Sequence, residues 1–116
     1  MFTKQETFDI VAKHLLTQNE QARAMVANST MVMIEGCAYR GKNGTKCAAG
    51  CLIPDELYSP KIEGKCSTHS DVKELLKDHN TMLVSSLQNI HDTYSVESWK
   101  KKLQQLAADN YLEFKF

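Results

Sequence analysis

Apolar residues recur at helical spacing near both ends of this 116-residue chain, and this pattern constrains the fold more than any other feature of the sequence. Near the start they fall at i, i+3, i+4, i+7 and i+8, which is the stripe of an amphipathic helix. Thr3 and Glu6 have the spacing of a capping box, so we expect the helix to begin just after Thr3. The residues of the stripe are Phe8, Val11, Ala12, Leu15 and Leu16.

The last third of the sequence predicts three more helices joined by short connections, which favour antiparallel packing. Ser70 and Ser95 are the expected caps of the first and third of these helices. Their apolar stripes are Val72, Leu75, Leu76 and His79, then Leu83, Leu87, Ile90 and Tyr94, then Val96, Trp99, Leu103, Leu106 and Ala107.

The final residues, 111–116, alternate between apolar and polar, with Leu112, Phe114 and Phe116 on one side. Alternation of this kind predicts a strand. Because three large apolar groups are unfavourable in water, we expect the strand to pack within the chain or to join two copies of it as a homo-oligomer.

The middle third has a different character. Residues 28–30, Asn-Ser-Thr, predict a loop, and residues 31–34 have the composition of a strand. Asn43-Gly44 then predicts the turn of a β-hairpin. A three-residue loop with Gly44 in the left-handed conformation would pair Gly41 with Thr45, and we favour it over a two-residue loop. The small side chains of residues 48–50 would let another element approach the backbone closely.

These patterns predict a single α+β domain over residues 1–116, with an N-terminal helix, a small β-hairpin and a C-terminal helical group. Hydrophobic residues make up 42% and charged residues 24%, which is typical of a globular protein. Lys plus Arg and Asp plus Glu are each 14, a balance that argues against a nucleic-acid binder. No stretch predicts a signal peptide or a membrane span, so we expect an intracellular protein.

Four cysteines, Cys37, Cys47, Cys51 and Cys66, allow three interpretations. We favour reduced thiols with no cofactor, because their spacing lacks the paired knuckles of a strong zinc motif. The alternative is a structural zinc site on the four thiolates, with His69, three residues after Cys66, as a substitute ligand. The third interpretation is a redox or catalytic thiol.

Catalytic motifs are not apparent, so we expect a protein that is not an enzyme. Nucleophilic catalysis needs a Ser, Cys or Thr with a base held close by. His91 and Asp92 are adjacent, but neighbours on a helix do not face each other.

A cluster of cations around the predicted turn is the strongest candidate for binding. No acid occurs from residue 36 to residue 54, while Arg40, Lys42 and Lys46 gather near Tyr39. Such a patch suits a phosphate group, a nucleotide or an acidic protein surface. Two other readings remain open: an ordinary solvated turn, or an Arg40 that pairs with Glu35 or Asp55 to hold the turn. The candidate partner-binding residues are Tyr39, Arg40, Lys42, Lys46, Asp55 and Glu56.

The central segment also resembles a group of small bacteriophage and bacterial proteins with no established activity. The resemblance rests on the pattern C-x-Y-R-x-x-x-G-x-K-C-A-x-G-x-L-I-P-D-E-x-Y, which runs here from Cys37 to Tyr58 with Glu63-Gly64 after it. The helical segments on either side look similar too. The resemblance implies a phage-linked setting, where small accessory proteins often neutralise a host factor, including immune proteins or their nucleotide signals.

We therefore expect a non-enzymatic binding protein that acts in a host bacterial cytoplasm and neutralises or modulates a host factor. Its partner would be a host protein or an anionic small molecule, and not a membrane. The alternative is a small zinc-stabilised domain with a structural or interaction role. A thiol- or acid-dependent enzyme ranks third.

Overall fold

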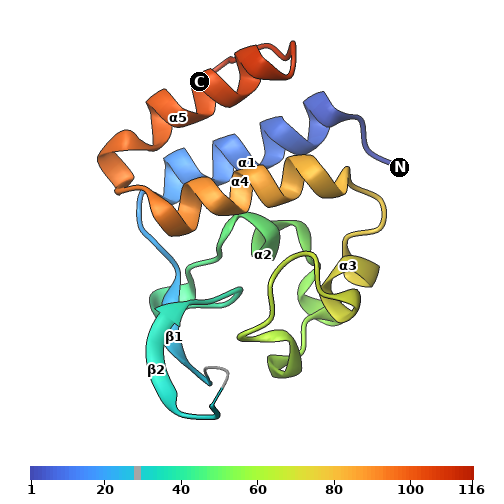
Figure 1. The fold of residues 1–116 in the computed structure, drawn as a ribbon. Coiled ribbons are helices and arrows are strands. Elements are labelled where there is room, and N and C mark those ends of the chain that lie inside the picture. The colour runs from blue at the N-terminus through green and yellow to red at the C-terminus, as the bar shows by residue number, and fades with distance from the viewer. Residues whose placement is uncertain (28–29) are drawn as a thin grey trace.

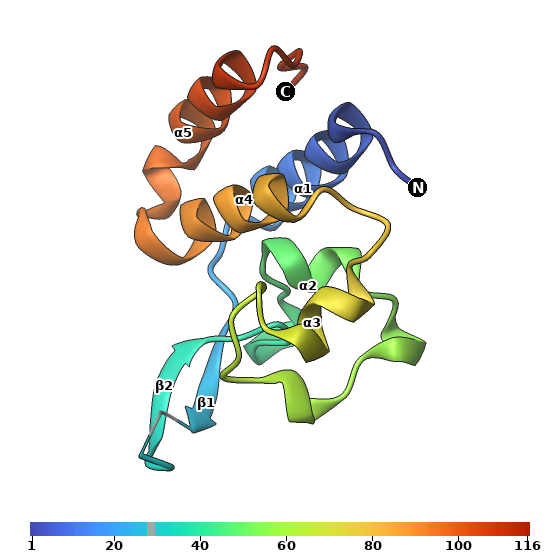
Figure 2. The same cartoon turned by 45° about the vertical axis from the view of Figure 1, so that its right-hand side comes forward.

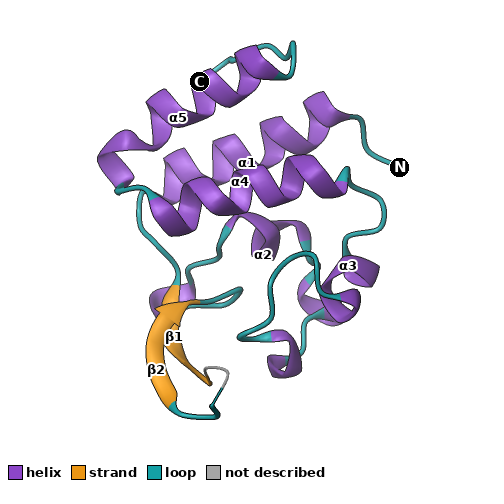
Figure 3. Cartoon of the chain, in the orientation of Figure 1, coloured by secondary structure: helices purple, strands orange, loops and turns teal. Residues whose placement is uncertain are grey.

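The computed structural model describes residues 1–27 and 30–116, and its elements confirm an α+β fold (Figures 1 and 3). The helices are α1 (Lys4–Gln18), α2 (Ala48–Leu52), α3 (Ser70–Leu75), α4 (Thr81–Thr93) and α5 (Val96–Asp109). The strands are β1 (Arg23–Ala27) and β2 (Met33–Cys37). Three single 3-10 turns cover Lys42–Gly44, Asp55–Leu57 and Pro60–Ile62.

Helices α1, α4 and α5 pack together as one layer, and α2 packs beneath α1 and α4 (Figure 1). The hairpin of β1 and β2 extends away from this body, as Figure 2 also shows. At the centre of the core between the helices, Phe8, Leu15, Leu87, Trp99 and Leu103 have no exposed surface. Burial of the predicted helical stripes is thus what joins the two ends of the chain.

The N-terminal helix is confirmed with its predicted start. Thr3 accepts a hydrogen bond from the backbone of Glu6, and the Glu6 side chain accepts one from the backbone of Thr3. Asn19 ends the helix in the left-handed conformation, with a φ of 54°. Its backbone N–H donates to the Leu15 carbonyl, which satisfies one of the last acceptors of the helix.

The hairpin is confirmed as an element, but its predicted place in the chain is wrong. Strands β1 and β2 pair antiparallel with Arg23 opposite Cys37 and Val26 opposite Ile34. Residues 31–34 were expected to be a strand and only partly overlap β2, whereas β1 was not predicted. Of the loop predicted at residues 28–30, the first two lie outside the described residues, and Thr30 is in a turn.

Around Asn43-Gly44 the predicted register is correct, although no extended hairpin forms. Gly41 donates to the Thr45 carbonyl over 2.8 Å, and Arg40 forms an isolated bridge with Lys46. Gly44 has a φ of +74°, the left-handed conformation that the three-residue loop requires. Pairing stops there because α2 begins directly afterwards, with the Cys47 side chain as its N-cap.

Helix α2 lies so close to the preceding chain that only glycine fits at position 50. A Cβ on Gly50 would meet the Tyr39 carbonyl oxygen at 2.3 Å. The close approach expected at residues 48–50 is therefore confirmed. It places the backbone of Tyr39 against the buried face of α2.

The C-terminal helices agree with the sequence patterns apart from α3, which has a different cap and ends at Leu75, before Leu76 and His79 of its predicted stripe. His69, not Ser70, is the N-cap of α3, and its Nδ1 accepts from the backbone of Asp71. Asn80 caps α4 by accepting from the backbone of Leu83. Ser95 is the N-cap of α5 by backbone conformation, as predicted.

The C-terminal tail is packed as expected, but it is not a strand. Residues 112–116 run extended along α1, where Gln5 exchanges two hydrogen bonds with the backbone of Glu113. Lys115 pairs with Asp9 over 3.1 Å. The Phe114 ring meets the Phe8 ring edge-on, with the ring centroids 6.3 Å apart. The tail therefore docks through aromatic packing, an ion pair and the hydrogen bonds of the Gln5 side chain, and not through sheet pairing.

Candidate functional site

Arg40, the central residue of the predicted cationic patch, points into the protein. Its guanidinium donates to the carbonyl oxygens of Gly50 and Ile53, each over 2.7 Å, and to Asp55 Oδ1 over 3.1 Å. It also lies over the Tyr58 ring, 4.7 Å from the centroid. Only 17% of the side chain is exposed. This geometry favours the structural reading of Arg40, with Asp55 as its ionic partner.

The other residues of the patch have carboxylate or carbonyl partners too. Lys46 pairs with Asp55 over 3.3 Å, and Lys42 pairs with Glu35 over 3.7 Å. Hydrogen bonding and charge from Lys46, and then charge from Arg40, hold the pKa of Asp55 below its usual value. The three cations of this acid-free stretch are therefore paired in space with Glu35 and Asp55, the acids at its two ends.

Tyr39 is buried, and its hydroxyl donates to the Lys65 carbonyl over 2.6 Å. The backbone N–H groups of Tyr39 and Arg40 donate to the two oxygens of Glu63, which also accepts from the Tyr58 hydroxyl. Glu56 is exposed beside this network. Sequence reasoning missed the role of Glu63, and the signal available was its place in the resemblance pattern.

Each of the four cysteines is a free thiol in its own setting. Cys47 is buried and accepts from the Gly50 backbone, and burial raises its pKa well above the usual range. Burial raises the pKa of Cys51 to about 12. Cys66 is exposed, and hydrogen bonds from Thr68 lower its pKa. The structure therefore makes Cys66 more acidic than Cys47 and Cys51.

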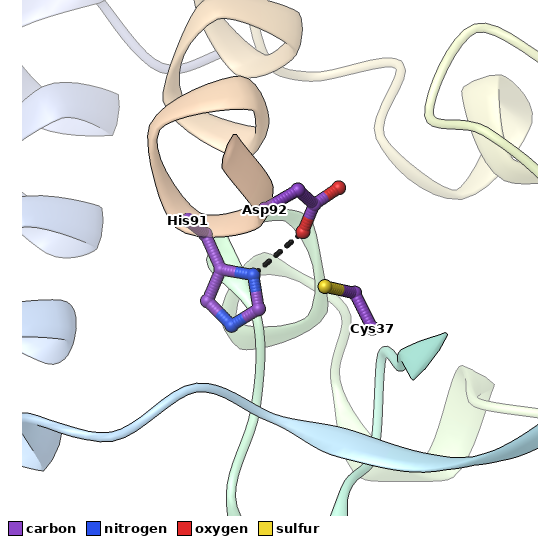
Figure 4. Close-up of side chains that lie close together, drawn as sticks. All are labelled: Cys37, His91 and Asp92. Carbon is purple, nitrogen blue, oxygen red and sulfur yellow. Dashed lines mark hydrogen bonds and ion pairs between the residues drawn. The ribbon is translucent and has the colours of Figure 1, made fainter. Parts of the chain in front are cut away.

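Cys37 lies in a cluster that joins the hairpin to α4. Its thiol lies next to Asp92, whose Oδ1 is 2.6 Å from the Nδ1 of the fully buried His91 (Figure 4). Asp92 Oδ1 also accepts from the Gln88 side chain. The expectation that His91 and Asp92 would not meet is wrong, because the short carboxylate of Asp92 bends back to its neighbour in the last turn of α4.

The hydrogen bonds of His91 determine where its proton lies. The backbone N–H of Ala22 donates to Nε2 over 3.0 Å, so Nε2 must be the bare nitrogen of a neutral ring. Nδ1 then carries the proton and donates it to Asp92. Neither nitrogen is left to act as a base toward Cys37. Burial, and then the charge of Asp92, raise the pKa of the Cys37 thiol to about 11.

The same proton position bears on a metal. Within the described residues, one group of three His, Cys, Asp or Glu side chains brings its ligand atoms within 4.8 Å of one another, and it is Cys37, His91 and Asp92. A metal on His91 would need the protonated Nδ1, so the histidine does not fit a ligand role in this arrangement. The group does not include Cys47, Cys51 or Cys66, so the predicted four-cysteine set is not brought together.

These contacts hold the base of what we call the hairpin arm, which comprises β1, β2 and residues 30–32. Ala22, just before β1, is bound to His91, and Cys37, the last residue of β2, lies against Asp92. Gln21 adds a hydrogen bond from its side chain to the His91 carbonyl. Two adjacent residues of α4 therefore hold both strands at the point where the arm leaves the body.

The outer part of the hairpin arm presents apolar side chains to solvent. The exposed fractions are 54% for Met25, 80% for Met31, 55% for Val32, 55% for Met33 and 45% for Ile34. Exposed apolar groups that gather in one place mark an interaction surface more often than scattered ones do. Residues 31–34 carried this signal in the sequence, where we interpreted it only as a strand.

A groove lies between the arm and the body. Its cavity volume is about 490 Å³, and it is lined by the arm, by residues 64–67 and by one side of α4.

Comparison with family models, with curated proteins and with solved structures found no match for this chain. Among the described residues, no helix combines the length and the apolar composition needed to cross a membrane.

Proposed function

We propose that this chain is a non-enzymatic binding protein, and that its hairpin arm contacts a partner protein. In the phage-linked setting that the resemblance implies, the partner is a host factor in the bacterial cytoplasm, which the chain neutralises or modulates. The observation that carries the proposal is the group of exposed apolar side chains on an arm that extends from the helical body.

The chemistry of the arm supports a protein partner. Three of its exposed side chains, Met25, Met31 and Met33, are methionines, whose unbranched thioethers adapt to an irregular apolar surface. Arg23 and Glu35 add a charged pair, 3.4 Å apart, next to them. An apolar centre with a polar rim is the usual anatomy of a protein interface.

The setting of Arg40 favours a protein over an anionic nucleotide. A guanidinium recognises phosphate through its planar set of donors. In this chain the donors of Arg40 already reach the carbonyls of Gly50 and Ile53 and the carboxylate of Asp55. An anion would have to displace those contacts.

The hydrogen bonds around Cys37 likewise support a function other than catalysis by Cys37, His91 and Asp92. A thiol nucleophile reacts as the thiolate. The raised pKa of Cys37 keeps the proton on its sulfur near neutral pH, and the nitrogens of His91 are bound to Ala22 and Asp92.

Affinity capture from a host lysate tests the proposal when two matched variants are compared. Met33→Lys places a charge on the arm, while Met82→Lys places the same charge on α4, where Met82 is 81% exposed. Loss of a hot-spot contact at the centre of an interface weakens binding by about 2 kcal/mol or more, roughly 30-fold. We expect Met33→Lys to lose the captured protein and Met82→Lys to retain it. Equal capture by both variants would overturn the proposal.

The zinc-stabilised domain is tested on the same preparation. Elemental analysis that finds about one zinc per chain, absent from a Cys37→Ser variant, would favour a zinc-stabilised domain over a metal-free binding protein.

A further inference from the structure

The groove beside the hairpin arm combines apolar and polar walls. Val26 and Ile34 come from the arm, Ser67 comes from the loop of residues 64–67, and Ser85 and Asn89 come from α4. Asp92 stands at the end of α4, where the groove meets the base of the arm. A ligand in the groove would therefore touch the arm and the body together.

Asp92 offers one carboxylate oxygen to such a ligand. The hydrogen bonds from His91 and Gln88 both end on Oδ1. Its other oxygen points away from His91 and Cys37 (Figure 4). The Asp92 side chain is 39% exposed and is part of the lining of the groove.

The groove has an uncompensated negative charge. Among the residues that line it, Asp92 and Lys65 are the charged ones. The Lys65 ammonium lies 2.7 Å from Asp71, outside the lining, and this contact lowers the pKa of Asp71. Because His91 is a neutral ring, Asp92 has no cationic partner within 4.0 Å among the described residues.

We propose that the groove binds a basic side chain, lysine or arginine, from the partner protein that the arm contacts. The methylene groups of that side chain would pack against Val26 and Ile34, and its charged end would donate to the outer oxygen of Asp92. Long basic side chains combine an apolar stem with a charged head in this way. This inference rests on the proposed function, because it identifies one group of the same partner.

The test uses two probes of equal shape, N-acetyl-arginine methylamide and its citrulline counterpart, which lacks the charge. Binding is followed by the backbone amide signals of Ser67, Ser85 and Asn89 in NMR titrations. We expect the arginine probe to shift these signals and to bind at least tenfold more tightly than the citrulline probe. Equal binding of the two probes, or no shift with either, would overturn the inference.

Variants locate the effect at the carboxylate. Asp92→Asn keeps an oxygen that accepts from His91 and Gln88 but removes the charge. Asp109→Asn is the matched control, because Asp109 lines a different cavity on α4 and α5. The preference for arginine over citrulline should disappear in Asp92→Asn and persist in Asp109→Asn. Loss in both variants, or in neither, would contradict the assignment.

A third probe distinguishes an amino-acid side chain from a free polyamine as the source of the cation. The outcomes also distinguish a failure of this inference from a failure of the proposed function. Tighter binding of putrescine than of the arginine probe would overturn a protein source for the cation. The probes need no partner, so their failure leaves the capture experiment with Met33→Lys intact. If that capture experiment fails while the preference for arginine is retained, the proposed role of the hairpin arm in partner binding would instead be overturned.

Discussion

Replacing Arg40 with alanine should destabilise the fold strongly. The change removes the Arg40 donor to the carbonyl of buried Ile53 and one of the two donors to the Gly50 carbonyl, which keeps its bond from the Ile53 backbone N–H. A buried acceptor left without its donor costs about 1–3 kcal/mol, and this is the loss expected at the Ile53 carbonyl. Because domains of this size are stable by only about 5–15 kcal/mol, the loss is a large part of the total.

Urea denaturation followed by circular dichroism measures this loss as a change in the free energy of unfolding. Arg40→Lys should fall between the wild type and Arg40→Ala, because one ammonium cannot reach both carbonyls in the geometry of a guanidinium. Lys42→Ala is the control, since the Lys42 side chain is 63% exposed. If Arg40→Ala kept its stability within about 0.5 kcal/mol, as an ordinary surface change does, the structural role would be refuted and recognition by Arg40 would regain support.

Two further predictions concern the tail and pH. Deleting residues 111–116 should lower the free energy of unfolding by at least about 2 kcal/mol, because it uncovers Phe8 and removes the apolar contacts of Leu112 and Phe114; an unchanged melting temperature would contradict this docking. Burial lowers the pKa of His79 and of His14, so below about pH 6.5 the unfolded chain takes up protons that the folded chain does not. The melting temperature should therefore fall between pH 7 and pH 5.5, and His79→Gln should reduce that fall; a flat profile would contradict it.

Local patterns predicted the helices well. The capping box of α1 and the apolar stripes of α4 and α5 depend on neighbours three or four residues away, so their consequences can be read from the chain itself. The turn at Asn43-Gly44 was equally local, and its register was correct. What failed there was the extension of the strands, which the start of α2 at Ala48 prevents.

The features that sequence reasoning missed depend on distant partners. Strand β1 shows little alternation, because its pairing with β2 rather than its own pattern defines it. Cys37 and Asp92 meet across the base of the arm with no motif that joins them. The tail alternates like a strand, yet α1 offers side chains and not a sheet edge. The tail therefore packs against α1 instead of pairing in a sheet.

The contact between the tail and α1 also governs how the chain can fold during synthesis. The apolar face of α1 is covered by α2, α4, α5 and residues 112–116, all of which a ribosome makes after α1. Helix α1 therefore cannot complete its packing as it emerges, because Phe8 has no contact with Phe114 until the residues of the tail have been made. This domain completes its fold only after those later residues have been made, and until then the first helix offers its apolar stripe to chaperones.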